Sequence, residues 1–93
     1  MRSQSLLGYR SGSVVYDPPS VAAAAQTTTT VTVTGAALGD PCFVGFSIDL
    51  QAMQLTGYVS SADVVTVVLR NGTAGALDLA SGTLRATVLK HTT

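Results

Sequence analysis

The sequence predicts an all-β protein: a small antiparallel β-sandwich or barrel of about five to seven strands with an extended N-terminal arm. Three observations favour this class. Short segments alternate apolar and polar residues with a period of two. Gly, Pro, Asn and Asp separate these segments as turn residues do. No segment is convincing as a helix. The pattern leaves sandwich and barrel open.

The N-terminal third contains little regular pattern. For a chain of 93 residues we expect one domain, organised as an arm, a β-domain and a tail at residues 1–12, 13–90 and 91–93. The first predicted strand is "SVVY" at 13–16, and "DPP" ends it because two prolines cannot both lie inside a sheet. The alanine-rich segment 20–26 is too short to nucleate a stable helix, so we expect a connector there.

The middle of the chain alternates most clearly. "TTTTVTVT" at 27–34 places Val31 and Val33 on one side of a strand. Threonine is β-branched and suits a pleated surface, so the other side is a stiff, neutral face of Thr28, Thr30, Thr32 and Thr34. "CFVGFSIDL" at 42–50 repeats the pattern, with Cys42, Val44, Phe46, Ile48 and Leu50 on one face. The two segments predict a strand–loop–strand unit, which could be one hairpin.

The C-terminal half predicts three more strands. These are "QLTGYVS" at 54–60, "VVTVVLR" at 64–70 and "TLRATVLK" at 83–90. The second is apolar on both faces and is expected at the centre of a sheet. The third should point Leu84, Ala86 and Val88 inward. "NGTAG" at 71–75 predicts a hairpin-type turn, because Asn-Gly readily adopts positive φ, and 76–82 predicts a loop or an edge strand.

Composition excludes several classes of protein. Charged residues make up 11% of the chain, less than half the usual share, and the net charge is zero. Basic residues do not cluster with aromatic ones, so nucleic-acid binding lacks its electrostatic signature. A single cysteine forbids an intrachain disulfide, and one cysteine with one histidine cannot form a structural zinc site. No run is long and apolar enough to cross a membrane, and the N-terminus does not resemble a signal peptide.

No group of residues in the sequence forms a catalytic or cofactor-binding motif. His91 follows the last predicted strand, where no second group would orient it as a base. Cys42 lies on the same predicted strand face as Val44, so we expect its thiol to be buried and structural. Asp17, Asp40 and Asp63 occupy turn positions, where their side chains serve turn formation. The sequence therefore predicts a protein that is not an enzyme, with no cofactor, metal or small-molecule substrate.

The remaining candidates for a function are exposed residues that could bind a partner. Phe43 and Tyr58 fall on outward positions of their strands and form a candidate interface face, although outward apolar residues can also belong to the core of a second sheet. In the arm, apolar and basic residues alternate with polar ones, which suits docking on a partner. The arm residues that we expect to bind a partner are Arg2, Leu6, Leu7, Tyr9 and Arg10. Alternatively, Leu6 and Leu7 fold back on their own domain.

Two long segments between residues 14 and 89 have a familiar pattern. "VVYDPPSVAAAAQTTTTVTVTGAALGD" and "LTGYVSSADVVTVVLRNGTAGALDLASGTLRATVL" resemble small β-rich structural proteins of tailed bacteriophages, which include head-decoration (cement) proteins and modules of tails and fibres. The resemblance implies a non-enzymatic virion protein on the outer capsid surface, synthesised in the host cytoplasm and bound to the major capsid protein. By analogy it also implies a homo-oligomer, with a trimer favoured over a dimer. The arm lies outside the resemblance.

The resemblance leaves a second function open. A tail-fibre or baseplate module that recognises host surface carbohydrate would need an exposed aromatic platform with Asp or Asn, and Tyr58 with Asp49 could provide one. The chain has only five aromatic residues and no tryptophan. We therefore rank this alternative below the capsid decoration protein.

Overall fold

The computed structural model describes residues 6–91 and folds them into six β-strands. The strands are β1 Leu6–Tyr16, β2 Gln26–Thr32, β3 Cys42–Phe46, β4 Gln54–Ser61, β5 Val64–Arg70 and β6 Gly82–His91. No helix occurs within this described range. The all-β prediction is confirmed, and the strand number lies inside the expected range.

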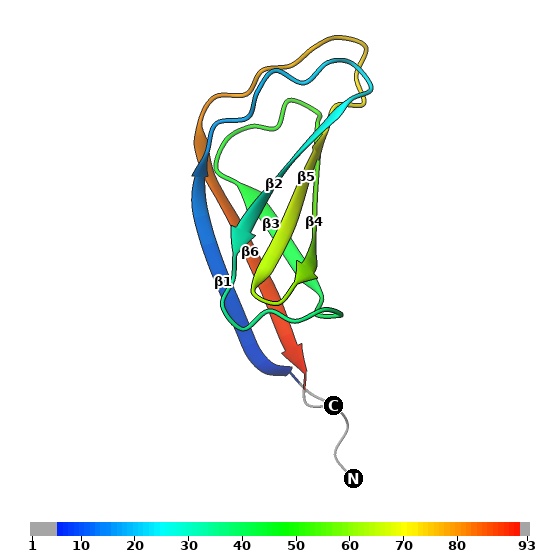
Figure 1. The fold of residues 1–93 in the computed structure, drawn as a ribbon. Helices are drawn as coiled ribbons and strands as arrows, with labels where there is room; N and C mark the ends of the chain where they lie inside the picture. The colour runs from blue at the N-terminus through cyan, green and yellow to red at the C-terminus, as the bar shows by residue number, and fades with distance from the viewer. Residues whose placement is uncertain (1–5, 92–93) are drawn as a thin grey trace.

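The strands form two antiparallel three-stranded sheets, in the orders β1-β6-β3 and β2-β5-β4 (Figure 1). The chain moves from one sheet to the other at every connection except the β4–β5 hairpin. The arrangement is therefore a sandwich of two sheets, with β6 and β5 at their centres. The central position expected for residues 64–70 is confirmed by the pairing of β5 with both β2 and β4.

The core lies between the sheets and is built by the alternation that the sequence predicts. Its most buried side chains come from β2, β5 and β6 and the loop that follows β2. They are Val31, Val33, Val65, Val67, Leu69, Leu84, Ala86 and Val88, each 2% exposed or less. Cys42, Val44 and Phe46 of β3 pack against this cluster and are partly buried. Each strand thus keeps one apolar face inside and one face outside.

A second apolar cluster closes the end of the sandwich where two long loops meet. Val21 and Met53 pack there with Leu69 and Leu79. Val21 and Leu77 exchange backbone hydrogen bonds of 2.8 and 3.0 Å, so the loops before β2 and before β6 run side by side (Figure 1). The segment expected as a loop or edge strand is a loop that carries this one β-bridge.

The predicted boundary at residue 12 is wrong. Residues 6–12 form the first part of β1 and pair with β6 from Leu6↔His91 onward. Gly12 explains how the strand continues past this point. A Cβ there would lie 2.2 Å from the carbonyl oxygen of Thr32, so only glycine lets β1 approach β2 so closely. The part of the expected arm that precedes β1, residues 1–5, lies outside the described residues.

Two predicted hairpins do not form. Residues 26–50 do form a strand–loop–strand unit, but β2 and β3 belong to opposite sheets. Residues 71–75 likewise connect β5 to a strand of the other sheet. Asn71 and Gly72 have negative φ, and Asn71 is fully buried. Local turn preference is overridden here because the Asn71 side chain finds backbone partners in the neighbouring loop.

Candidate functional site

The predicted interface residues lie on two opposite faces of the sandwich. Tyr9 and Phe43 are 64% and 61% exposed on the outer face of the β1-β6-β3 sheet, and Tyr58 is 54% exposed on the outer face of the β2-β5-β4 sheet. Phe43 and Tyr58 therefore do not form one interface face. A role in binding stays a prediction for each of them.

The other predicted arm residues have different positions. Leu6 and Leu7 belong to β1, so their backbone is part of the sheet. Arg10 is exposed, and its Nη1 donates to the carbonyl oxygen of Tyr9 at 3.2 Å. Arg2 lies outside the described residues. Of this group, only Tyr9 is shown to present a large side chain on the outer face of its sheet.

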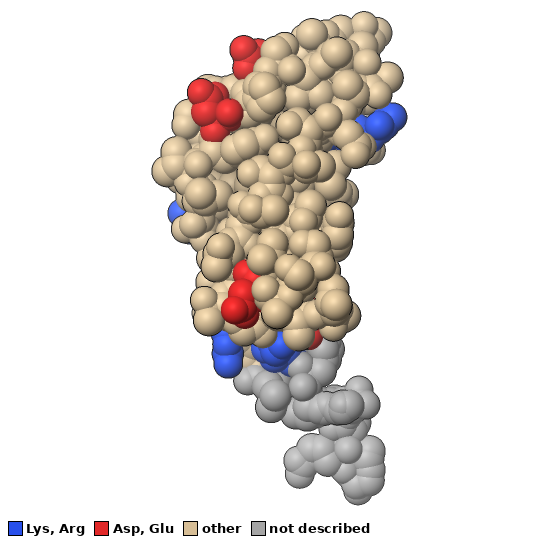
Figure 2. Space-filling view, viewed as in Figure 1, with Lys and Arg blue, Asp and Glu red and all other residues tan. Residues whose placement is uncertain are grey.

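Alternation along three strands creates the surface around Tyr9 and Phe43. We call it the Arg85 face, and its ten residues are Tyr9, Ser11, Ser13, Val15, Phe43, Gly45, Thr83, Arg85, Thr87 and Leu89. It contains two aromatic side chains, four hydroxyl side chains, one arginine and no acid. Figure 2, seen from the direction of Figure 1, shows how few charged residues the molecule exposes between its ends.

Arg85 occupies the centre of this face because β6 is the central strand. Its neighbours Leu84 and Ala86 are buried, so alternation directs Arg85 outward. In the register, Ser13 of β1 and Gly45 of β3 lie on either side of it. The guanidinium of Arg85 forms no hydrogen bond or ion pair with any other residue in the range 6–91.

A shallow hollow of about 290 Å³ lies beside Arg85. It is lined by Ser11, Gly12, Ser13, Arg85 and Thr87. The side chains of the lining are therefore one guanidinium and three hydroxyls, all of which can donate hydrogen bonds. Sequence reasoning missed this site. Alternation in the sequence places Arg85 and Thr87 on one outward face of the last predicted strand. It does not place Ser11 and Gly12 beside them, because these two residues belong to the expected arm, and it does not show that the strand beginning at Ser13 pairs with the last one.

The outer face of the β2-β5-β4 sheet differs in chemistry. We call it the threonine face, and it consists of Gln26, Thr28, Thr30, Thr32, Gln54, Thr56, Tyr58, Ser60, Val64, Thr66, Val68 and Arg70. The predicted exposure of the β2 threonines is confirmed. The hydroxyl of Thr66 donates to Ser60 Oγ at 2.7 Å. Arg70 is its only charged residue, and it does not line the hollow beside Arg85.

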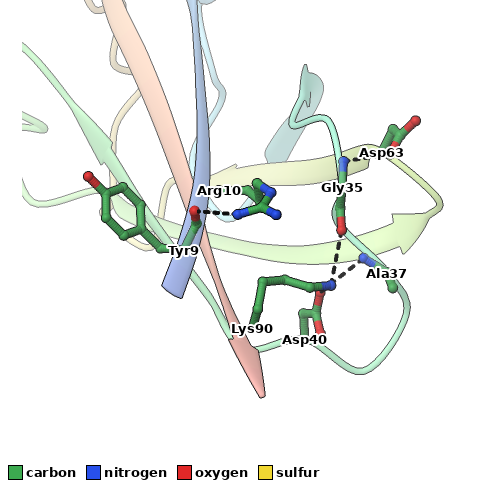
Figure 3. Close-up of polar contacts among 7 residues, drawn as sticks. All are labelled: Tyr9, Arg10, Gly35, Ala37, Asp40, Asp63 and Lys90. Carbon is green, nitrogen blue, oxygen red and sulfur yellow. Dashed lines mark hydrogen bonds and ion pairs between the residues drawn. The ribbon is translucent and has the colours of Figure 1, made fainter. Parts of the chain in front are cut away.

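The tip of the β1–β6 ribbon is fixed to the loop that follows β2 (Figure 3). Lys90 Nζ donates to the carbonyl oxygen of Gly35 at 3.0 Å and pairs with Asp40 Oδ2 at 2.5 Å. Asp40 also accepts the backbone N–H of Ala37, and Asp63 accepts that of Gly35 at 2.8 Å. These contacts hold the ribbon that carries Tyr9 on its outer side.

The aspartates and the cysteine have structural environments. Asp40 and Asp49 accept backbone N–H groups three and two residues away, which for Asp40 is the expected turn role. Asp63 instead accepts the N–H of Gly35 in another loop, 28 residues away in the sequence. Burial raises the pKa of the Cys42 thiol, so less of the reactive thiolate is present at neutral pH. Within the described range, no three His, Cys, Asp or Glu residues gather as metal ligands.

Comparison of the chain with protein-family models, with curated proteins and with solved structures gives no match. The resemblance to phage structural proteins therefore depends only on the sequence segments quoted above. Residues 6–91 also contain no helix long and apolar enough to cross a membrane.

Proposed function

We propose that this protein is a non-enzymatic structural protein of a phage virion, a decoration protein that docks on the outer surface of the capsid through the Arg85 face. The observation that carries the proposal is the composition of that face. Tyr9, Phe43 and Arg85 stand on one sheet with no acid beside them. Aromatic residues and arginine are the types enriched at the energetic centres of protein interfaces.

The rigidity of the sheet supports this use of the face. The backbone of paired strands is already ordered, so docking of this face costs little backbone conformational entropy. The hydroxyl residues between the aromatic ones can exchange water for hydrogen bonds with a partner and carry no charge that would have to be desolvated. A clamp of this kind stabilises an assembled shell by mass action because it binds only the assembled state.

The proposed partner is the major capsid protein, bound at junctions between capsomers. The decoration protein itself would act as a homo-oligomer, and by analogy we propose a trimer. Neither the partner nor the oligomer requires catalysis, a cofactor or a small-molecule substrate. What it does require is buried area and complementary shape, and a flat sheet face with two exposed aromatic rings can supply both.

Binding of purified variants to undecorated shells tests the proposal. Phe43→Ala and Tyr9→Ala should each weaken shell binding by roughly tenfold or more, as expected for central aromatic anchors. Tyr58→Ala is the matched control, because it removes an aromatic ring of similar exposure from the opposite face and should change binding less than twofold. Equal losses for Phe43→Ala and Tyr58→Ala would reject the Arg85 face as the docking surface.

Imaging of virions that carry a labelled copy of the protein locates it. Label over the head supports a decoration protein, whereas label confined to the tail tip would favour the carbohydrate-binding alternative. Truncation should remove residues 1–5 rather than 1–12, because residues 6–12 pair with β6 and their loss would expose that strand.

A further inference from the structure

The hollow beside Arg85 has no role in the fold that the structure reveals. It lies on the outer face, away from both apolar clusters. We propose that it is a subsite for one carboxylate, an Asp or Glu side chain on the protein surface to which the Arg85 face docks. This inference rests on the proposed function, and it adds the chemical group that the partner must present.

The strand register brings the donors of the subsite together. Ser13 is opposite Arg85 on the neighbouring strand, and Ser11 is opposite Thr87. All four side chains are on the outer side of adjacent strands, which lie about 4.8 Å apart. A carboxylate in the hollow can therefore accept from the guanidinium and from at least one hydroxyl. Arginine and carboxylate groups match in geometry and form paired, charge-assisted hydrogen bonds.

The space around Arg85 also suits an incoming side chain. On the side away from the hollow the neighbour is Gly45, and a Cβ built there would touch nothing within 4 Å. The guanidinium can therefore turn toward a ligand without meeting a side chain at that register position. Phe43 and Tyr9 lie further along the same face toward the tip of the ribbon, so the carboxylate subsite and the aromatic anchors would be covered by one partner.

Charge on this face favours an anion. Arg85 has no ion-pair partner among residues 6–91, whereas Lys90 is paired with Asp40. No acid belongs to the Arg85 face. The acid that follows β1, Asp17, is four residues beyond Ser13, roughly 13 Å along an extended chain. An unpaired guanidinium among hydroxyl groups is thus left with all its donors available to a ligand.

A carboxylate fits better than a nucleic acid or a larger polyanion. Only one cation faces the hollow, and the chain has zero net charge. Phosphate backbones are bound by several lysines and arginines acting together. One guanidinium with three hydroxyls matches the single charge and two oxygens of an Asp or Glu side chain. The complementary site on the partner is therefore an acidic residue flanked by apolar groups.

Titration of the free protein tests the subsite without any shell. In nuclear magnetic resonance spectra, acetate should shift the backbone amide signals of Ser11, Ser13 and Thr87, with a dissociation constant on the order of 10 mM, in the range of one charge-assisted hydrogen bond. Acetamide, which has the same shape without the charge, should leave them unchanged. Arg85→Gln should abolish the acetate response, and Arg85→Lys should weaken it because the ammonium group lacks the planar fork.

Arg70 provides the matched control for charge. It is also an exposed arginine on the outer side of a central strand, its guanidinium has no partner in the described range, and it does not line the hollow beside Arg85. Arg70→Gln should leave the acetate response intact. An acetate response that persists in Arg85→Gln, or that appears equally around Arg70, would overturn the inference.

Shell binding separates this inference from the proposed function. Arg85→Gln should weaken binding about tenfold, Arg85→Glu should weaken it further through like-charge repulsion, and Arg70→Gln should have less than a twofold effect. Equal binding by wild type and Arg85→Gln overturns the inference and leaves the decoration function standing. If wild type does not bind shells but acetate still titrates the hollow, the decoration function fails and the carboxylate site remains.

Discussion

The two ends of the sandwich are closed by opposite kinds of polar contact. At the Asn71 end, residues 17–25 and 71–81 are joined by a neutral amide that is fully buried. At the Lys90 end, residues 33–41 are joined to β6 by an ion pair whose side chains are 21% and 14% exposed. The first contact joins two loops and the second joins a loop to a strand, and their surroundings differ.

The Asn71 amide uses its full hydrogen-bonding capacity. Nδ2 donates to the carbonyl oxygens of Val21 and Gly75, both at 2.8 Å, and Oδ1 accepts from the backbone N–H and the hydroxyl of Thr73 at 2.9 and 2.6 Å. A buried polar group satisfied in this way is costly to remove because its partners are left without water. The Lys90 pair can exchange its contacts for water and salt. The comparison predicts that stability depends more on the uncharged end.

Asn71→Ala should have the largest effect. Loss of the amide removes its hydrogen bond to the carbonyl oxygen of Val21, which keeps the N–H of Leu77, and leaves the backbone N–H of Thr73 without its acceptor. We expect a decrease of about 3 kcal/mol in the free energy of unfolding. Chemical denaturation measures this value. Thr73→Val is the control, because it removes only one hydroxyl partner and should cost about 1 kcal/mol. A loss below about 1 kcal/mol in Asn71→Ala would contradict the importance of this end.

Asn71→Asp tests the same comparison through the pH dependence of stability. A carboxylate cannot donate to the two carbonyl oxygens, so burial should raise the pKa of the introduced carboxyl above its unfolded value of about 3.9. The variant should therefore be most stable below about pH 4, and should lose stability as the pH rises through the folded-state pKa. A stability profile parallel to that of the wild type between about pH 3 and about pH 7 would contradict this expectation.

Gly35→Ala should have an intermediate effect at the Lys90 end. Gly35 has a φ of 95°, which alanine adopts only with strain, and an added Cβ would lie 3.0 Å from Nε of Arg10. We expect a loss of about 1–2 kcal/mol. Gly39→Ala is the matched control, with a φ of 94° and nothing within 4 Å of the added Cβ. The difference between the two variants in thermal unfolding isolates the contact with Arg10 from the backbone strain.

Lys90→Met should have the smallest effect. The apolar stem is kept while the charge is lost, so we expect a loss of about 0.5–1 kcal/mol for this pair, whose side chains still reach solvent. In 1 M NaCl, a concentration at which screening reaches about 3 Å, the difference between wild type and variant should shrink. The cost of Asn71→Ala should stay the same in salt. A salt-sensitive Asn71→Ala or a salt-insensitive Lys90→Met would remove the distinction between the ends.

Local pattern predicted much of the fold for a physical reason. In a strand, neighbouring side chains point to opposite faces, so "TLRATVLK" alone places Leu84, Ala86 and Val88 inside and Arg85 outside. The same argument placed Val31 and Val33 in the core and Phe43 and Tyr58 outside. These assignments depend only on residue order within one strand, and the structure confirms each of them.

The candidate site could not be predicted in the same way. The segment "RSGS" at 10–13 has no apolar alternation, and serine and glycine are weak strand formers. It becomes a strand because the long β6 offers a complete row of backbone partners beside it. The sequence therefore indicated that Arg85 points outward, but not that Ser11, Ser13 and Thr87 surround it.

The sequence by itself determined the fold class, the inward and outward sides of β2 to β6 and the near absence of charge. Tertiary structure decided which strands are neighbours, where β1 begins and that Asn71 closes one end instead of forming a hairpin turn. The reason is that alternation is a local property of a strand. Pairing across strands is a long-range choice, and it is set by which backbone donors, acceptors and apolar faces can be satisfied together.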